Sequence, residues 1–338
     1  MPLQFNIETL RELVATPKNA IIVTHTNPDG DAIGSSLGLY HFLLNRGFEV
    51  SLIAPTDYAS YLHFLPQDDH VLIYPANPKA AIQRANEAQL LFCLDFNTYS
   101  RLEGLGKILS ALQIPKILID HHLEPEQFDY YVWNTQASST AELVHFFIDQ
   151  IGASAEITPD IATCLYTGLA SDTGRFMHSL SANVFACAAQ LHAANANVQM
   201  VNNQLFNSYS LDRLQLWGHS IAQRMVVLPE YQTAYIYLTK ADFEQFNHQI
   251  GDTDGIVNLP LQVSNIRFAA LFRDEKEKVK ISFRSKGNFS VNDFARMHFN
   301  GGGHFNAAGG SSVLNLQESI DKFLQVLPLY KKSLNAEW

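Results

Sequence analysis

The chain has 338 residues and a formal net charge of −10 at pH 7, with 17% charged and 47% hydrophobic residues. This length is enough for two domains, each with its own core. The acidic balance disfavours a broad basic groove for long nucleic acid, because such binding relies on many phosphate contacts. A short anionic substrate held by a few basic groups and bound cations is compatible with it.

The three cysteines, Cys93, Cys164 and Cys187, lie in apolar neighbourhoods, and their odd number argues against a disulfide framework. They indicate reduced core residues in a reducing compartment. The first residues do not show a basic end followed by an apolar stretch, so no secretory signal is expected. No apolar run is long enough to span a bilayer. We therefore expect a cytoplasmic protein without a membrane partner.

Apolar runs of strand length alternate with helical patterns through the first part of the chain. The pattern predicts helices over 7–17, 37–44, 79–87 and 101–112, and strands over 20–24, 48–53, 71–73, 90–95 and 116–120. This alternation is typical of an α/β protein with a doubly wound, mostly parallel sheet. His25, Asp95 and Asp120 follow or end three of these strands. Because the carboxyl ends of parallel strands meet at one edge, these side chains are predicted to converge.

The pattern in the remainder of the chain predicts more helices and then a second group of strands. Helices are expected over 138–151, 159–170 and 183–194, and over 198–222 as two pieces broken near Asn207. After Pro229, strands over 235–238, 266–272 and 279–284 indicate a separate α/β domain. We predict an N-terminal domain over 1–194, a helical linker over 195–225 and a smaller C-terminal domain over 226–338.

One stretch carries three polar residues where a strand passes into a helix. His25, Asp29 and Asp31 lie within seven residues. Two close carboxylates repel unless a cation lies between them, and imidazole with carboxylate suits a divalent metal. The same residues also fit a polar turn in which Asp29 or Asp31 caps the helix. The stretch alone does not decide between these interpretations.

A glycine-rich stretch lies near the end of the chain. Gly301, Gly302 and Gly303 precede His304, and small residues continue to Gly310. Consecutive glycines let backbone N–H groups turn toward one anion, and a helix expected to start here would add its positive end. A flexible loop, or glycines needed only for tight packing, is the alternative. We favour a cradle for an anion.

Taken together, five motifs resemble the DHH phosphoesterase family along nearly the whole chain. In order, they are His25-x-x-Pro28-Asp29-Gly30-Asp31-Ala32-x-Gly34-Ser35, the isolated Asp95, Asp120-His121-His122, Ser171-Asp172-Thr173-Gly174, and Gly301-Gly302-Gly303-His304-x-x-Ala307-Ala308-Gly309. The last is similar to the signature of the first type of DHH-associated domain. The resemblance implies an N-terminal DHH domain with a dinuclear metal site and a C-terminal domain that binds substrate.

The resemblance also implies a set of metal ligands. Two divalent ions are expected, with Mn²⁺ the first choice and Mg²⁺ or Co²⁺ as options. One ion would be held by His25 and Asp29, the other by Asp31, His121 and Asp172, with Asp95 bridging the two. Asp120 resembles the residue that fixes a histidine, and His122 the residue that faces the substrate phosphate; we expect these two as the catalytic residues.

Within the family, the chain resembles the nanoRNase/pAp-phosphatase branch. The resemblance implies that a hydroxide activated by two metals hydrolyses short oligonucleotides and the 3′-phosphate of adenosine 3′,5′-bisphosphate (pAp). A phosphodiesterase for cyclic di-AMP or pApA is the alternative, and a non-catalytic nucleotide-binding sensor is a distant one. The resemblance also implies that the protein forms a homodimer.

The expected substrate-binding residues lie in the C-terminal domain. They are Arg284, Gly301, Gly302, Gly303 and His304. Arg101 and Arg175 are weaker candidates, since a basic residue on a helix or turn is usually solvated.

Overall fold

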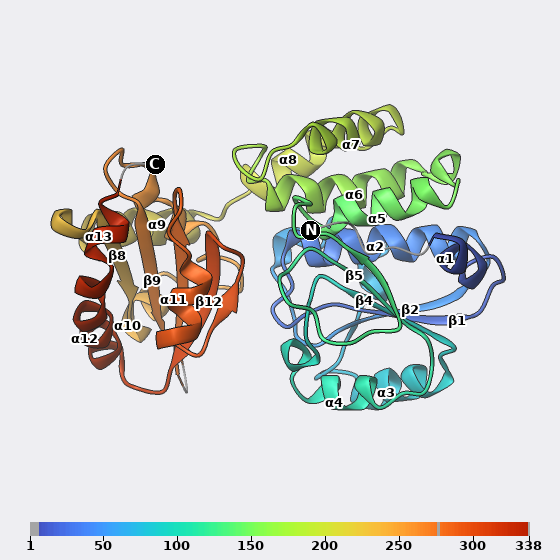
Figure 1. Ribbon diagram of the computed structural model, residues 1–338, viewed down its shortest axis with the longest axis horizontal. Coiled ribbons are helices and arrows are strands. Elements are labelled where there is room, and N and C mark those ends of the chain that lie inside the picture. The colour runs from blue at the N-terminus through green and yellow to red at the C-terminus, as the bar shows by residue number, and fades with distance from the viewer. Residues whose placement is uncertain (1–6, 276–277, 337–338) are drawn as a thin grey trace. The chain divides into compact units, whose positions relative to one another are not determined.

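A computed structural model of the chain describes residues 7–275 and 278–336 (Figure 1). The chain divides into two compact units, with the boundary between Ser208 and Tyr209. The boundary falls inside the range 195–225, in which the sequence predicts a linker. Each unit contains its own six-stranded sheet.

The first unit is built on a sheet whose strand pairs are all parallel, in the order β3-β2-β1-β4-β5-β6. The strands are β1 (Asn19–Val23), β2 (Glu49–Ala54), β3 (Leu72–Ile73), β4 (Leu90–Leu94), β5 (Lys116–Asp120) and β6 (Tyr130–Trp133). All five residues of β4 are buried, as expected for a central strand covered on both faces. The doubly wound parallel sheet is therefore confirmed, and β6 is an edge strand that the sequence pattern did not reveal.

Helices cover both faces of this sheet (Figure 1). One face carries α2 (Gly30–Asn45), α5 (Thr140–Gln150) and α6 (Pro159–Asp172), and the other carries α3 (Pro78–Glu87) and α4 (Gly104–Ser110). Neighbouring residues of a strand point to opposite faces. Accordingly, Ile22 packs in the cluster with α2, whereas Ile21 packs in the cluster with α3 and α4. The remaining helices of this unit are α1 (Ile7–Leu13), α7 (Ala182–Ala193) and α8 (Val198–Phe206).

The order of the strands reverses between β1 and β4. The chain runs outward from β1 to β3, then returns to β4 beside β1 and runs outward in the other direction to β6. Val23 of β1 pairs with Cys93 of β4, so these two strands end side by side. In open α/β sheets, ligands bind at the carboxyl ends of the strands where the order reverses. This edge is where the structure places the polar motifs.

Helices α2 and α6 pack unusually closely because glycines line their contact. A Cβ atom on Gly34 would lie 2.6 Å from the Cys164 carbonyl oxygen and 2.7 Å from the Gly168 nitrogen. Both neighbours are backbone atoms and cannot turn aside. The glycines of α2 therefore hold its first turns against α6, which ends at Asp172.

A single helix over 101–112 was a wrong prediction. The chain instead forms a 3₁₀ turn over Tyr99–Leu102 and then α4, with Glu103 between them at φ 51°. A left-handed φ at a non-glycine residue cannot continue a helix. The break lets Gly106 lie against the Tyr99 carbonyl oxygen, which would be 2.0 Å from a Cβ at that position.

The second unit has a mixed sheet in the order β11-β12-β10-β9-β8-β7. Among the strands that the structure describes, β8 and β9 pair in parallel, and the other pairs are antiparallel. The strands are β7 (Met225–Leu228), β8 (Thr233–Leu238), β9 (Phe268–Asp274), β10 (Val279–Ser285), β11 (Gly302–Gly303) and β12 (Ala307–Ser312). The helices are α9 (Leu211–Gln223), α10 (Lys240–Gln245), α11 (Val291–His298), α12 (Leu316–Val326) and α13 (Lys331–Leu334).

The two helices expected in the linker belong to different units. In the first unit α8 packs on α6, and in the second α9 packs on β7 and β8. The core of the second unit is rich in phenylalanine, and it contains the buried residues Phe268, Phe272, Phe283, Phe294 and Phe323. Edge-to-face contacts among these rings add to their burial.

The expected helix start at the glycine-rich stretch was also a wrong prediction. The segment forms β11 and β12, and α11 ends before it at His298. The reason is steric: a Cβ on Gly301 would lie 2.0 Å from the Gly309 carbonyl oxygen. The glycines let two strand segments approach closely. None of the helices in the described residues has the length and apolarity to cross a bilayer.

We expect Gly34→Ala to destabilise the first unit by roughly 1–3 kcal/mol, the usual cost of overpacking a core. The matched control is Gly218→Ala in α9, where no atom lies within 4 Å of the added methyl group. That variant should gain up to about 1 kcal/mol from helix propensity. Calorimetric unfolding of both variants checks the pair. A Gly34→Ala protein as stable as the wild type would contradict the close contact described here.

Candidate metal centre

The carboxyl ends of three neighbouring strands bring the polar motifs together. His25 lies two residues beyond β1, Asp95 directly follows β4, and Asp120 is the last residue of β5. His25 and Asp95 are buried, and Asp120 is fully buried. The convergence predicted from the alternating pattern is therefore present.

The first turn of α2 adds two carboxylates. Asp29 is the N-cap residue, and its Oδ1 accepts hydrogen bonds from the backbone N–H groups of Asp31 (3.0 Å) and Ala32 (3.1 Å). Its carboxylate also lies within 4.8 Å of ligand atoms of His25 and Asp95. The two interpretations that the sequence left open are thus compatible, because one oxygen of Asp29 can cap the helix while the other remains for a cation.

Asp31 is completely buried and is held by the N-terminus of α5. Its Oδ2 accepts from the Thr140 N–H at 2.6 Å, and its Oδ1 accepts from the Ala141 N–H at 2.9 Å. The Thr140 hydroxyl also donates to Asp95 Oδ1 at 2.9 Å. The sequence motifs do not include Thr140 and missed this role. The one available signal was the run of hydroxyl residues Ser138, Ser139 and Thr140, at the end of which α5 begins.

Asp95 is shared between two histidines. His25 Nε2 lies 3.3 Å from Asp95 Oδ2, and His121 Nε2 lies 3.5 Å from Asp95 Oδ1. His121 Nε2 is also 3.4 Å from Asp172 Oδ2, where α6 ends. A carboxylate at a helix C-terminus faces the negative end of the dipole and needs a positive neighbour. His121 meets part of that need, and a cation would meet the rest.

Backbone carbonyl groups orient both imidazole rings. The Nδ1 atom of His25 lies 2.8 Å from the Thr26 carbonyl oxygen, and that of His121 lies 3.2 Å from the Ala137 carbonyl oxygen. An Nδ1–H that donates to a carbonyl leaves Nε2 as the metal-binding nitrogen. In both residues it is Nε2 that approaches the carboxylates.

The backbone at Asp95 adopts a conformation that is uncommon for residues other than glycine. Its φ is 63°, in the left-handed region. Arg101 Nη1 donates to its carbonyl oxygen at 3.3 Å, and its own N–H donates to Ile119. Such strain persists only where the surroundings hold it, and it is frequent at functional sites. Here it directs one carboxylate between His25 and His121.

Three groups of possible metal ligands share Asp95, and two of them consist of residues that the sequence predicts as ligands. One group is His25, Asp29 and Asp95, and the other is Asp31, Asp95 and His121, with the ligand atoms of each group within 4.8 Å of one another. Carboxylate oxygen and imidazole nitrogen together suit divalent first-row metals. The donor set therefore fits a pair of divalent cations. The structure brings together all six residues expected as ligands: His25, Asp29, Asp31, Asp95, His121 and Asp172.

The electrostatics of the carboxylate cluster, Asp29, Asp31, Asp95 and Asp172, call for positive charge. Burial and the Asp95 carboxylate raise the pKa of Asp31 well above its usual range, and burial and the Asp31 carboxylate do the same for the pKa of Asp172. Burial lowers the pKa of His121, but Asp95 and Asp172 outweigh it and raise this pKa to about 9. Protons therefore occupy the cluster wherever cations do not.

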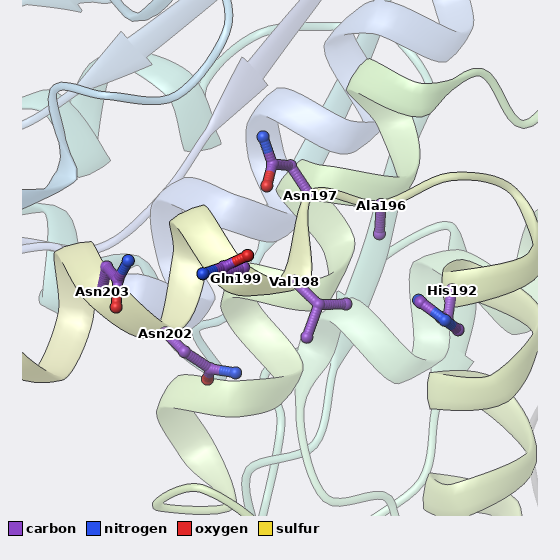
Figure 2. A pocket seen from close by; sticks show the side chains of 7 residues that line it. All are labelled: His192, Ala196, Asn197, Val198, Gln199, Asn202 and Asn203. Atoms are coloured by element: carbon purple, nitrogen blue, oxygen red, sulfur yellow. The ribbon is translucent and has the colours of Figure 1, made fainter.

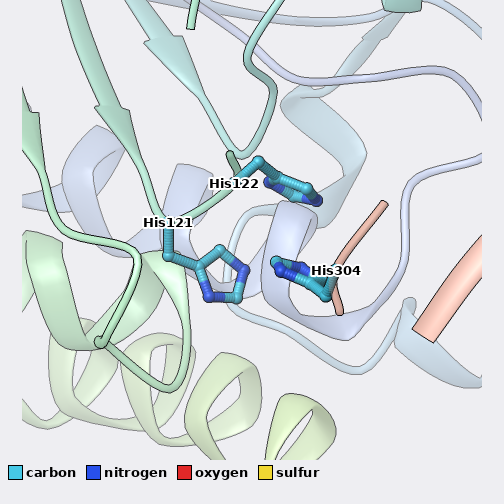
Figure 3. A group of neighbouring side chains, drawn as sticks. All are labelled: His121, His122 and His304. Carbon is cyan, nitrogen blue, oxygen red and sulfur yellow. The ribbon is translucent and has the colours of Figure 1, made fainter. Parts of the chain in front are cut away.

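Asp120 and His122 form a pair beside the cluster. Asp120 Oδ1 lies 2.7 Å from His122 Nδ1, so Asp120 orients the His122 ring. The neighbouring rings of His121 and His122 are nearly perpendicular, with centroids 5.0 Å apart (Figure 3). The Trp133 indole N–H donates to the His122 carbonyl oxygen at 2.7 Å and holds the backbone.

The residues expected to bind substrate lie in the second unit. Arg284 is in β10, opposite Ala307 of β12. The anion cradle expected from the glycines stays a prediction. The N–H groups of Gly301, Gly303 and His304 donate to Ala295, Asn292 and Ala307, respectively. These contacts and the close approach of Gly301 to Gly309 fit tight packing, the alternative that the sequence left open.

A depression of about 540 Å³ lies where α7 passes into α8 (Figure 2). It is lined by His192, Ala196, Asn197, Val198, Gln199, Asn202 and Asn203. No member of the carboxylate cluster lines it, so this depression is separate from the candidate metal centre.

The sequence matches two family models and several known proteins. Residues 19–169 match the DHH family, N-terminal domain, and residues 231–331 match the DHHA1 domain. The bifunctional oligoribonuclease and PAP phosphatase NrnA of Thermus thermophilus is 30% identical over 90% of this chain and 88% of that protein. The cyclic-di-AMP phosphodiesterase GdpP of Bacillus subtilis is 27% identical over 95% of this chain but 49% of that protein.

A solved structure agrees with these matches. The exopolyphosphatase-related protein from Bacteroides fragilis is 36% identical and superimposes with a TM-score of 0.92, covering 98% of this chain and 97% of that one. The sequence matches and this likeness, together with a polar site at the reversal of the strand order, lead to one conclusion. The chain belongs to the DHH family and carries a C-terminal DHHA1 domain.

Proposed function

We propose that the protein is a metal-dependent phosphohydrolase that cleaves short oligonucleotides and removes the 3′-phosphate of pAp. The observation that carries the proposal is Asp95, whose two carboxylate oxygens face two separate ligand groups. A carboxylate shared in this way suits a site that holds two cations side by side. A module that only binds nucleotides would have no need of it, which argues against the sensor alternative.

Two divalent ions, when bound, supply a water of lowered pKa and positive charge for the phosphoryl oxygens. We assign them the ligands His25 and Asp29, and Asp31, His121 and Asp172, with Asp95 shared. The protein's own contribution is preorganisation, because phosphoryl transfer needs mainly positioning and electrostatic stabilisation. The α5 N-terminus holds Asp31, and the Thr140 hydroxyl holds Asp95. No covalent nucleophile is required.

Our proposal for the substrate class rests on the names of the relatives and on the net charge of the chain. The NrnA relative is named for oligoribonuclease and PAP phosphatase activities. A net charge of −10 favours small anionic substrates over long nucleic acid. We propose Mn²⁺ as the metal, with Mg²⁺ and Co²⁺ as alternatives that the same ligands accept. Arg284, Gly301, Gly302, Gly303 and His304 remain our proposed substrate-binding residues, and the cytoplasmic location and the homodimer remain predictions.

A second candidate function has a specific observation in its favour. The relative GdpP is named as a cyclic-di-AMP phosphodiesterase, and it matches nearly the whole of this chain. This chain, however, covers only 49% of that protein. We therefore place hydrolysis of cyclic di-AMP or pApA second.

A substrate panel tests the proposed function. With Mn²⁺, the purified protein should release mononucleotides from RNA of two to five nucleotides and orthophosphate from pAp. Cyclic di-AMP, pApA, pyrophosphate and a long RNA are the comparison substrates, each also assayed with Mg²⁺. Cleavage of cyclic di-AMP alone would select the second candidate, and inertness toward the whole panel would overturn the hydrolase proposal.

Replacement of Asp95 by Asn tests the shared carboxylate. The change keeps the size of the side chain but removes the charge that both ligand groups use. We expect kcat/KM to fall by more than the roughly 10–100-fold that loss of an outer-sphere partner costs, and the number of bound Mn²⁺ ions to fall as well. Asp160→Asn, at an exposed position in the first turn of α6, is the matched control. Unchanged turnover and Mn²⁺ content in Asp95→Asn would refute the assignment.

Metal binding should release protons near neutral pH. Without metal, His121 has a pKa raised to about 9, and the pKa values of Asp31 and Asp172 are raised. A metal binds the deprotonated ligands, so each bound ion displaces protons and the apparent affinity rises with pH up to about 9. Calorimetric titration with Mn²⁺ at pH 7.5, in buffers of different ionisation enthalpy, counts the protons. Binding heats that do not depend on the buffer would contradict the raised pKa values.

A further inference from the structure

His122 has a partner on each of its ring nitrogens. Its Nδ1 lies 2.7 Å from Asp120 Oδ1, and its Nε2 lies 3.0 Å from Arg101 Nη1. An arginine side chain can only donate hydrogen bonds. The Nε2 atom of His122 is therefore the acceptor, and the proton of the neutral ring is on Nδ1, where it is donated to Asp120. Arg101 thus donates a hydrogen bond to His122, and His122 donates one to Asp120.

This arrangement conflicts with the role that the sequence predicts for His122. A neutral imidazole can donate only one hydrogen bond, and the Nδ1–H of His122 is committed to the fully buried Asp120. While Arg101 is in place, His122 therefore has no ring N–H to offer to a phosphoryl oxygen. The cationic group on this side of the cluster is Arg101.

Arg101 is fixed on several sides. Its Nη1 also donates to the Asp95 carbonyl oxygen at 3.3 Å, and its own carbonyl oxygen accepts from the Thr26 N–H at 3.0 Å. These contacts tie it to the loops after β4 and β1. The side chain is partly exposed. Among residues 7–275 and 278–336, no carboxylate oxygen lies within 4.0 Å of its guanidinium nitrogens.

The guanidinium group of Arg101 has more N–H donors than these contacts use. It carries five N–H bonds in a rigid, planar fork, and the contacts named above use only Nη1. A charged fork without a carboxylate partner suits a phosphoryl group, which it can meet with two parallel hydrogen bonds. We propose that Arg101 binds a phosphoryl oxygen of the substrate beside the metal centre, and that His122 and Asp120 are positioning residues for it. This inference rests on the proposed phosphohydrolase function and moves the phosphate contact from His122 to Arg101.

Orthophosphate binding to the Mn²⁺-loaded full-length protein tests the proposal without any turnover. We expect Arg101→Met to raise the Kd for orthophosphate at least tenfold and Arg101→Lys, which keeps the charge, to raise it less. Both titrations are run at saturating Mn²⁺, with the metal content checked, because Arg101 also holds the Asp95 carbonyl oxygen. Arg84→Met is the matched control, because Arg84 is an exposed arginine on α3 that forms an ion pair with Glu87 on the same helix. It should leave phosphate binding unchanged.

A double-mutant cycle separates the two roles. If His122 acts by orienting Arg101, His122→Ala should weaken phosphate binding in the wild-type background and have little further effect in the Arg101→Met background. If His122 contacts the phosphate itself, its replacement will cost as much in both backgrounds, and that result would overturn the proposal. Unchanged phosphate affinity in Arg101→Met would overturn it as well.

Kinetics with pAp and a dinucleotide complete the test. Arg101→Met should raise KM more than it lowers kcat, with partial recovery in Arg101→Lys, whereas a merely structural role would lower the Mn²⁺ content or the melting temperature instead. Failure of the proposed function is distinguishable from failure of this inference. A wild-type protein that binds orthophosphate through Arg101 but cleaves none of the panel would refute the hydrolase and leave the phosphate site standing.

Discussion

The need to hold four carboxylates together governs the construction of the first unit. Asp31 is fully buried, and its two oxygens accept N–H groups from the first turn of α5. Like charges at this separation raise one another's pKa unless a cation lies among them. The backbone amides and two histidines offset part of the charge, and the cations that we propose would offset the rest. The fold therefore supplies a place that favours positive charge, from protons or from divalent ions.

Close helix packing follows from this arrangement. Gly168 of α6 faces Asp31, whose Oδ1 would lie 2.6 Å from a Cβ at that position. Gly30, at the start of α2, would place a Cβ 2.6 Å from the Ser171 hydroxyl oxygen. The glycines beside the carboxylates are thus explained by close approach between α2 and α6. They bring the two helix ends that carry acidic residues to one point.

The sequence predicted what depends on periodicity and missed what depends on contacts between distant segments. The buried strands are continuous apolar runs, so the parallel sheet and the convergence of His25, Asp95 and Asp120 could be foreseen. The edge strand β6 could not, since it has four residues of which only the last two are buried. The helix start expected at the glycine-rich stretch was wrong, because the approach of Gly301 to Gly309 exists only after β12 has paired with β10.

The same distinction separates the ligands from the residues that orient them. A metal ligand shows in the sequence as an acid or a histidine at a strand end. Thr140 and Arg101 carry no such signal, because their importance comes from the Asp95 oxygens that each of them contacts. The Thr140 hydroxyl holds the carboxylate and the Arg101 guanidinium holds the carbonyl of one strained residue, so both sides of Asp95 are fixed from elements that follow it in the chain. Preorganisation of this site therefore depends on contacts between segments that are distant in the sequence. The hydrogen bonds of the folded chain reveal these contacts, and the residue types at the strand ends do not.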